Sequence, residues 1–205
     1  MLDVLLALPS LSHLLSLHDS PEEENDDFYL NIDVLNSDTK YLSANDFCLK
    51  QYDQPVFSFL NYNIRSLSSN FNNFTELMDS AKLKLDVILL TESWLSDESA
   101  ESFQLNSYSG FDSYRTLQKG GGVSIFLRDI FNVVQVPEFT YMESFIELNT
   151  VKIENPQGAD IIIIGIYRPP SGCPEKIFIS LDKIISKFKN KKVIISGNNI
   201  ILLIS

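Results

Sequence analysis

Polar residues follow several apolar runs of this sequence at the points where the runs end. The four stretches concerned are "NYNIRS" with Asn63, "TESW" with Glu92, "IYRPP" with Tyr167 and Arg168, and "SGNN" with Asn198 and Asn199. A carboxylate and an amide suit a hard cation such as Mg²⁺, which prefers oxygen ligands and keeps several waters. A tyrosine can donate a hydrogen bond, and an arginine can hold a phosphate in a fork. These residue types therefore indicate phosphate chemistry at a metal site.

Each of these residues also has a purely structural explanation. Asn63 can satisfy the backbone of its own turn, Glu92 can be a solvated loop charge or the start of a helix, and Trp94 is a typical lid over a core. The prolines of "RPP" can simply end a strand. The "GGG" at 120–122 resembles a phosphate loop only superficially, because no strand leads into it with a helix following. It predicts a flexible lead into a strand instead.

The elements that would position these residues lie between residues 56 and 205. Buried strands are predicted at "VFSFLNYNI", "DVILLTES", "GADIIIIGIYRPP" and "KKVIISG". Further strands are predicted at "GGGVSIFLRD" and "FNVVQV", joined by a tight connection at Asp129-Ile130, and at "SFIELNTVKIEN". The last of these alternates Phe145, Glu147 and Asn149 against Ile146, Leu148 and Thr150, which predicts that one face is apolar.

Two amphipathic helices are predicted between the strands. One is "NFNNFTELMDSAKLK", with Asn70 as its cap, and the other is "PEKIFISLDKIISKFK", with proline in its first turn. Asn63 and Glu92 end two buried strands joined by one helix, a connection that normally makes the strands parallel neighbours. The pattern predicts mixed β-sheets flanked by helices, with the polar strand ends facing a common edge.

The net charge of −11 is concentrated at the start of the chain. Residues 1–55 hold 11 acidic and 2 basic side chains, or −9, whereas residues 56–205 hold 16 acidic and 14 basic ones, or −2. We interpret residues 1–55 as an acidic, largely disordered leader and residues 56–205 as one domain. A partner-binding helix over residues 2–17 is the alternative for the leucine-rich start. Asp3 and Pro9 argue against a secretion signal.

Composition also argues against several classes of protein. No apolar run approaches the about 18–20 residues needed to cross a bilayer, so the sequence predicts no membrane association. Cys48 and Cys173 have neither the number for a disulfide framework nor a metal-ligand spacing, which favours a reduced, intracellular setting. The near-neutral body lacks the basic excess from which a DNA binder is usually argued, so any such binding would depend on a local patch.

None of these stretches is specific alone, but their order and spacing along the chain are together specific to one family of proteins. The body resembles the endonuclease domain of non-LTR (LINE- or jockey-like) retrotransposons, within the endonuclease/exonuclease/phosphatase superfamily that includes apurinic endonucleases and DNase I. The resemblance covers roughly residues 41–200 and implies a DNase I-like four-layer α/β sandwich. The matching stretches are "FLNYNIRSLSSNFNNF", "DVILLTESWL", "YSGFDSYRTLQKGGGVSIFL", "IIIGIYRPPSG" and "KKVIISGNN".

The resemblance implies roles for individual residues. Asn63 matches an asparagine that helps to orient the metal and the base, and Glu92 matches a metal ligand, so Mg²⁺ is expected at Glu92 and Asn63. Tyr167 matches the tyrosine that contacts the scissile phosphate, and Arg168 is expected to contact phosphate beside it. Intact relatives are magnesium-dependent phosphodiesterases that nick target DNA, which implies DNA as partner and the nucleus as the place of action.

The sequence departs from the family where its G-D-F-N motif is expected. Gly197 matches, but Asn198 stands in the place of the aspartate, and Asn199 takes the place of the asparagine. An amide cannot accept a proton from an attacking water as a carboxylate does. The catalytic histidine of the family's S-D-H motif has no counterpart either, because the histidines of this chain are His13 and His18.

We therefore expect a truncated and inactive endonuclease domain whose C-terminal portion is missing. The alternative is a non-catalytic remnant that binds nucleic acid or protein, with DNA binding weak or absent in this chain. Whether the chain is an enzyme at all is left open by the residues themselves.

Overall fold

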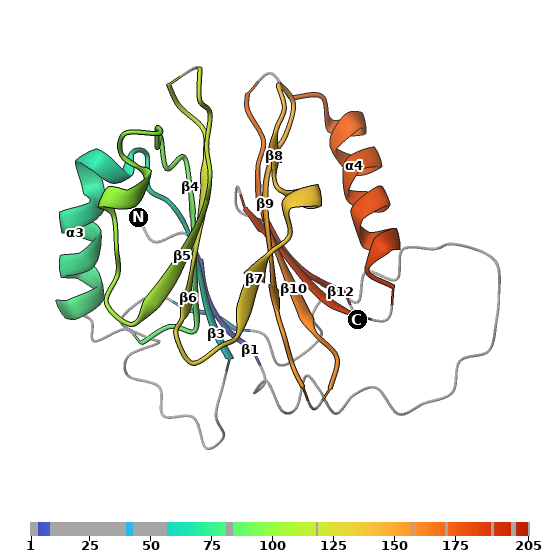
Figure 1. The fold of residues 1–205 in the computed structure, drawn as a ribbon, viewed down its shortest axis with the longest axis horizontal. Coiled ribbons are helices and arrows are strands. Elements are labelled where there is room, and N and C mark those ends of the chain that lie inside the picture. The colour runs from blue at the N-terminus through green and yellow to red at the C-terminus, as the bar shows by residue number, and fades with distance from the viewer. Residues whose placement is uncertain are drawn as a thin grey trace.

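The computed structural model describes residues 4–8, 40–42, 57–80, 84–117, 119–156, 158–170, 172–189, 191–197 and 200–204. Two β-sheets pack face to face, and a helix covers the outer face of each sheet (Figure 1). The layers therefore run helix, sheet, sheet, helix. This confirms the predicted mixed α/β sandwich.

The first sheet has the strand order β2-β1-β3-β4-β6-β5. Its strands β3 and β4 are parallel and joined by α3, with Asn63 opposite Thr91, as the sequence predicted. The other pairings in this sheet are antiparallel. The bounds are β1 Val4–Leu8, β2 Lys40–Leu42, β3 Phe57–Asn63, α3 Leu67–Ser80, β4 Val87–Thr91, β5 Tyr108–Ser113 and β6 Val123–Arg128.

The second sheet has the strand order β12-β11-β10-β9-β7, with β8 paired to β9. Here β10 and β11 are parallel and joined by α4, so each sheet contains one parallel pair with a crossover helix. The bounds are β7 Val133–Gln135, β8 Tyr141–Met142, β9 Glu147–Ile153, β10 Ile161–Tyr167, α4 Pro174–Lys187, β11 Lys192–Gly197 and β12 Ile200–Ile204, with short 3₁₀ helices at Ala100–Ser102 and Pro137–Phe139.

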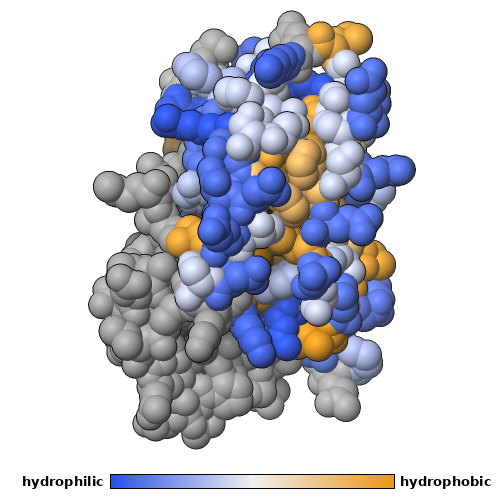
Figure 2. All heavy atoms as spheres, turned by 90° about the vertical axis from the view of Figure 1, so that its left-hand side faces the viewer, coloured by the Kyte–Doolittle hydropathy of each residue, from blue (hydrophilic) through white to orange (hydrophobic). Residues whose placement is uncertain are grey.

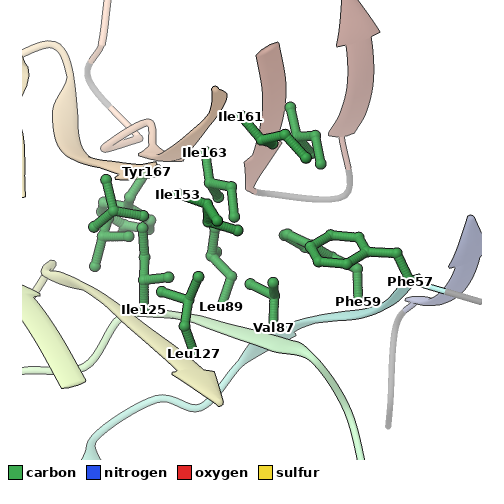
Figure 3. Packing of buried hydrophobic residues seen from close by; sticks show 13 residues of the cluster. Phe57, Phe59, Val87, Leu89, Ile125, Leu127, Ile153, Ile161, Ile163 and Tyr167 are labelled. Carbon is green, nitrogen blue, oxygen red and sulfur yellow. The ribbon is translucent and has the colours of Figure 1, made fainter. Parts of the chain in front are cut away.

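The core of the molecule lies between the two sheets (Figure 3). It is built from the inward-facing side chains of β3, β4, β6, β9, β10 and β11, which are large and apolar. Gly165 of β10 lets the sheets approach closely, because a Cβ there would lie 2.6 Å from Val123 Cγ1 and 3.0 Å from Leu89 Cδ1. The labelled members of this cluster are Phe57, Phe59, Val87, Leu89, Ile125, Leu127, Ile153, Ile161, Ile163 and Tyr167.

The two helices cover the outer faces of the sheets through their apolar sides. In α3, Leu67, Phe74 and Met78 are buried against the first sheet. In α4, Ile177 and Ile184 pack on the second sheet. Figure 2 shows the α3 side, where hydrophilic residues form most of the described surface and hydrophobic side chains are visible between them.

Helix α3 begins at Leu67, before the predicted cap, so the assignment of Asn70 as the cap is wrong. The hydroxyl of Ser66 accepts a hydrogen bond from the Ser69 N–H at 3.3 Å and caps the first turn. Asn70 instead uses its side-chain nitrogen to bind the carbonyls of Ile64 and Arg65, at 2.9 and 3.0 Å. It therefore satisfies the turn that precedes the helix.

Strands β6 and β7 lie in different sheets, although a tight turn joins them as predicted. The N–H of Phe131 donates to the Arg128 carbonyl at 3.1 Å within this turn. The chain thus crosses from the first sheet to the second at Asp129-Ile130. Strand β5, at the edge of the first sheet, was not predicted, because "YSGFDS" has little of the apolar pattern of a buried strand.

The apolar face predicted for β9 is confirmed by Leu148, which packs in one cluster with α4, but Glu147 and Asn149 on the opposite face are fully buried as well. Asn149 donates to the carbonyls of Phe111 and Val123, at 2.7 and 3.0 Å, and accepts from Gln135 at 3.0 Å. These contacts join the second sheet to the first. Both faces of β9 are therefore covered, one by the other sheet and one by α4.

Part of the predicted leader belongs to the first sheet. Val4–Leu8 forms β1, antiparallel to β3, so the alternative of a helix over residues 2–17 is wrong at these positions. The rest of residues 1–56, apart from β2, lies outside the described residues, so the disordered leader and the boundary near residue 55 stay predictions. Neither helix in the described part of the chain has the length and apolar character to cross a membrane.

Candidate active site

Three of the predicted site residues meet at one edge of the two sheets. The side-chain nitrogen of Asn63 donates a hydrogen bond to Glu92 Oε1 at 2.8 Å, and Tyr167 lies close enough to the same carboxylate for its charge to raise the Tyr167 pKa. Asn63 and Glu92 follow from β3 and β4 of the first sheet, whereas Tyr167 ends β10 of the second. The cluster therefore bridges the two sheets, at the top in the view of Figure 1.

The turn after β3 holds Asn63 in place. Its side-chain oxygen accepts a hydrogen bond from the Arg65 N–H at 3.2 Å. Arg65 and Ser66 have φ of 48° and 90°, in the left-handed region that non-glycine residues rarely adopt. Asn63 thus satisfies its own turn, as the structural explanation held, and contacts Glu92 as well.

The segment that carries Glu92 is also held in a left-handed backbone conformation. Glu92 and Trp94 have φ of 55° and 54°. Such residues persist only where their surroundings determine them strongly, and they cluster at functional sites. Here the Ser66 N–H donates to the Glu92 carbonyl at 2.8 Å, and the Trp94 N–H donates to the Gly121 carbonyl at 2.9 Å. The start of α3 and the glycine loop together fix the segment.

A buried ion pair lies behind this segment. Glu147 of β9, with no exposed surface, accepts hydrogen bonds from Arg115 Nε and from the Gly122 N–H, both at 2.6 Å. Arg115 Nη2 forms a salt bridge with the same carboxylate. Because Arg115 and Gly122 belong to the loop between β5 and β6, Glu147 ties that loop to the second sheet. Sequence reasoning missed this pair, whose signal was a carboxylate inside an apolar strand.

The three glycines at 120–122 permit this close approach. Their φ values of 104°, 70° and 91° all lie in the left-handed region. A Cβ on Gly121 would overlap the Glu147 carboxylate, and a Cβ on Gly122 would overlap Ser93 Oγ. The glycines do precede a strand as predicted, but Gly121 and Gly122 are buried and hydrogen-bonded, so the predicted flexibility is wrong for them.

Tyr167 combines a buried ring with a polar tip. Its ring belongs to the core between the sheets (Figure 3). Burial raises the pKa of Tyr167 above its ordinary value, and the negative charges of Glu92 and Glu147 raise it further. The hydroxyl therefore stays protonated at neutral pH and remains a hydrogen-bond donor.

An open cleft of about 830 Å³ lies beside the cluster. Its walls come from the segment after β4, the loop between β5 and β6, the turn before β9 and the end of β10. The side chains that line it are mixed in character, with two carboxylates beside aromatic and apolar groups. They are Glu92, Trp94, Tyr114, Arg115, Thr116, Leu117, Met142, Glu143, Ser144, Tyr167, Pro169 and Pro170.

The donors at this edge fit a magnesium site with few protein ligands. Within the described residues, no three His, Cys, Asp or Glu side chains come close enough to hold a metal ion together. Mg²⁺, however, is commonly held by one or two carboxylates, with water and phosphate completing the shell. Glu92, half-buried at the cleft, can supply one carboxylate. Asn63 directs its nitrogen at Glu92, so in this arrangement it orients the carboxylate.

The roles of the remaining predicted residues stay predictions. Arg168 follows Tyr167 directly and is exposed. Asn198 and Asn199 lie outside the described residues, so their predicted roles stay untested. Gly197 ends β11, and a Cβ there would overlap the Ile166 carbonyl of β10. The structure thus brings together residues from three of the four polar stretches singled out in the sequence and places Gly197 of the fourth against β10.

No family model and no curated protein matches the sequence. Solved structures match its fold. The 3′ phosphatase NExo from Neisseria, bound to product DNA hairpin, is 17% identical, with 68% of this chain and 56% of that chain covered and a TM-score of 0.50. The AP endonuclease LMAP from Leishmania major is 15% identical, with coverages of 67% and 54% and a TM-score of 0.47. D. rerio TDP2, complexed with single strand DNA product, is 15% identical, with coverages of 69% and 65% and a TM-score of 0.48.

The chain spans less than two thirds of the length of each of these structures. At such identities the likeness establishes the fold alone. The strand order, the two parallel pairs with their crossover helices and the match to NExo agree on one architecture. This chain has a DNase I-like fold.

Proposed function

We propose that this chain carries the metal- and phosphate-binding corner of a magnesium-dependent phosphodiesterase that acts on DNA in the nucleus. The proposed type is the endonuclease of non-LTR retrotransposons, which the sequence resembles, and the chain by itself does not hydrolyse DNA. The observation that supports the site is the contact of Asn63, Glu92 and Tyr167 across the two sheets, beside an open cleft.

Each residue of the cluster has a distinct part in this proposal. Glu92 holds Mg²⁺ through its carboxylate, and Asn63 fixes the orientation of that carboxylate by its 2.8 Å hydrogen bond. Tyr167, protonated at neutral pH, donates to a phosphate oxygen in the cleft. When bound, Mg²⁺ supplies Lewis acidity at the phosphate and stabilises charge on the leaving oxygen.

The proposed lack of hydrolysis rests on the missing aspartate of the family motif and on the contacts that already hold Glu92 and Glu147. A general base must lie within hydrogen-bond reach of the water that it deprotonates. Glu92 accepts a hydrogen bond from Asn63 and lies beside Tyr167, and Glu147 is held by Arg115 and the Gly122 N–H. Neither is placed to take a proton. The sequence supplies Asn198 where the family has its aspartate, and an amide is no substitute.

The metal site is tested by terbium luminescence, because Tb³⁺ occupies oxygen-ligand sites and is sensitised by nearby aromatic rings. We expect Tb³⁺ to be sensitised by the wild-type chain and displaced by millimolar Mg²⁺. Glu92→Gln should abolish the signal, whereas Glu143→Gln, which alters another carboxylate of the same cleft, should retain it. Equal Tb³⁺ binding by wild type and Glu92→Gln would refute the proposed site.

The lack of hydrolysis is tested by nicking of supercoiled plasmid with Mg²⁺. We expect no nicking above the level of Glu92→Gln or of EDTA-treated protein. EDTA-sensitive nicking that is lost in Glu92→Gln would show that the surviving corner suffices for catalysis and would overturn this part of the proposal.

A non-catalytic nucleic-acid-binding module is the second candidate. It is favoured by the hydrogen bonds that already hold Glu92 and Glu147 and by the cation of Lys119 at the cleft loop. Binding through phosphates weakens steeply as salt rises, so a titration of DNA at several salt concentrations tests it. Salt-independent or absent binding would exclude this candidate and leave a protein-binding remnant as the remaining alternative.

A further inference from the structure

We infer that the cleft beside Glu92 holds one unstacked base of a DNA strand against the indole of Trp94, and that the chain therefore prefers single-stranded to duplex DNA. The inference rests on the proposed function, because it takes the phosphate of that nucleotide to lie at Glu92 and Tyr167. It adds a base-binding subsite to the phosphate-binding corner.

The placement of Trp94 is not explained by core packing. Trp94 belongs to none of the three hydrophobic clusters formed by the described residues, and its side chain is half-buried. Its backbone instead adopts a left-handed conformation, as does that of Glu92 two positions earlier. Both side chains line the same cleft, so the conformation presents an indole and a carboxylate side by side.

The loop opposite Trp94 contributes a cation and an apolar side chain. Lys119 Nζ lies 5.9 Å from the centroid of the indole, near the outer limit of about 6 Å for a cation–π contact. A base can displace so long a contact and leave the ammonium to pair with a phosphate. Leu117 of the same loop lines the cleft with 95% of its surface exposed. The indole and the leucine side chain can contact the faces of a base, and the ammonium can contact the phosphate of the same nucleotide.

Size and charge agree with this occupant. A cleft of about 830 Å³ lies within the range of about 300–1,000 Å³ typical of small-ligand sites. Glu92 and Glu143 repel a phosphate, so a divalent cation must accompany it. Bases of a duplex are already stacked and paired, and extruding one costs free energy, whereas a single strand presents its bases without this cost. Binding should thus require a divalent cation and favour single strands.

The subsite is tested through the intrinsic fluorescence of Trp94, which is the only tryptophan of the sequence. The probe is a short oligothymidylate in Ca²⁺, compared with an abasic oligomer of the same length and with a duplex. We expect saturable quenching by oligothymidylate and none by the abasic strand. The abasic strand and the duplex should bind at least about 5-fold more weakly, the lower bound of a base–aromatic stack.

A variant provides the second readout, by anisotropy of a labelled oligothymidylate. Trp94→Leu should weaken binding of oligothymidylate by about 5- to 150-fold and leave binding of the abasic strand unchanged. Phe178→Leu replaces an exposed aromatic ring of α4 outside the cleft lining and should change neither. The abasic comparison uses wild-type protein, so the test stands even where Trp94→Leu does not fold.

The outcomes separate this inference from the proposed function. Equal binding of base-containing and abasic strands, lost in Glu92→Gln, overturns the base subsite alone and retains the phosphate-binding corner. No binding of any oligomer in Ca²⁺ overturns the inference together with the DNA part of the proposed function.

Discussion

The ion pair between Arg115 and Glu147 offers the most stringent test of the structure. Glu147 has no exposed surface and accepts two hydrogen bonds of 2.6 Å, one from Arg115 and one from the Gly122 N–H. The side chain of Arg115 is 26% exposed. Removal of Glu147 leaves a partly exposed charge, whereas removal of Arg115 leaves a fully buried one. The two variants should therefore lose different amounts of unfolding free energy.

The expected magnitudes follow from that asymmetry. Breaking a buried pair by removing one partner costs about 3–5 kcal/mol of unfolding free energy, because a buried charge is left uncompensated. Glu147→Gln leaves Arg115, which can reach water, so we expect about 3 kcal/mol. Arg115→Met leaves a fully buried carboxylate with the Gly122 N–H, so we expect about 5 kcal/mol. The double variant buries no unpaired charge and should cost less than the sum of the two.

Urea unfolding of the full chain, followed by circular dichroism, measures all four proteins of this double-mutant cycle. A second readout is the fluorescence emission of Trp94, whose backbone N–H donates to the carbonyl of Gly121, next to the ion pair. Glu154→Gln, which breaks the more exposed pair with Lys152, is the matched control and should change the midpoint little. Single variants that each cost less than about 1 kcal/mol, or a strictly additive double variant, would refute the buried pair.

Two further predictions concern the second sheet. Lys192, 4% exposed, has no hydrogen-bond partner for its ammonium among the described residues, and burial lowers its pKa. Since the folded chain binds fewer protons than the unfolded chain between that lowered pKa and 10.5, stability should rise with pH across this window. Lys192→Met should remove this pH dependence and raise the unfolding free energy at pH 7 by about 1–3 kcal/mol. Urea unfolding at several pH values measures both effects, and a lower unfolding free energy in the variant would contradict the prediction. Gly165→Ala should cost about 1–3 kcal/mol by overpacking against Val123. Gly110→Ala, whose Cβ would lie 3.1 Å from Phe126 Cε1, should lower the unfolding free energy less. Equal decreases for the two variants in urea unfolding would count against the close approach of the sheets at Gly165.

Much of the site could be predicted because its parts lie at the ends of strands with strong local patterns. The runs that became β3, β4, β10 and β11 are rich in apolar residues, and most of their positions are buried as expected. A helix between β3 and β4 dictates a parallel pair, which brings Asn63 beside Glu92. The order of the elements alone therefore predicts that these two residues lie close together.

The support around the site was not predictable in the same way. Glu147 lies opposite the apolar face of its strand, as the alternation predicted, but alternation cannot tell a solvated face from one covered by a second sheet. Its partner Arg115 lies in a loop of the other sheet, far away in the sequence. Asn70 was similarly taken for a cap, although it binds the carbonyls of the turn before the helix.

By itself, the sequence determined the most apolar strands, the two helices and the order in which polar residues follow them, because these depend on periodicity over neighbouring positions. Only the tertiary structure decided that the chain changes sheets between β6 and β7 and that Tyr167 of one sheet meets Glu92 of the other. Both outcomes depend on how two sheets bury their apolar faces against each other. That burial is set by contacts between residues distant in the chain, which no local pattern records.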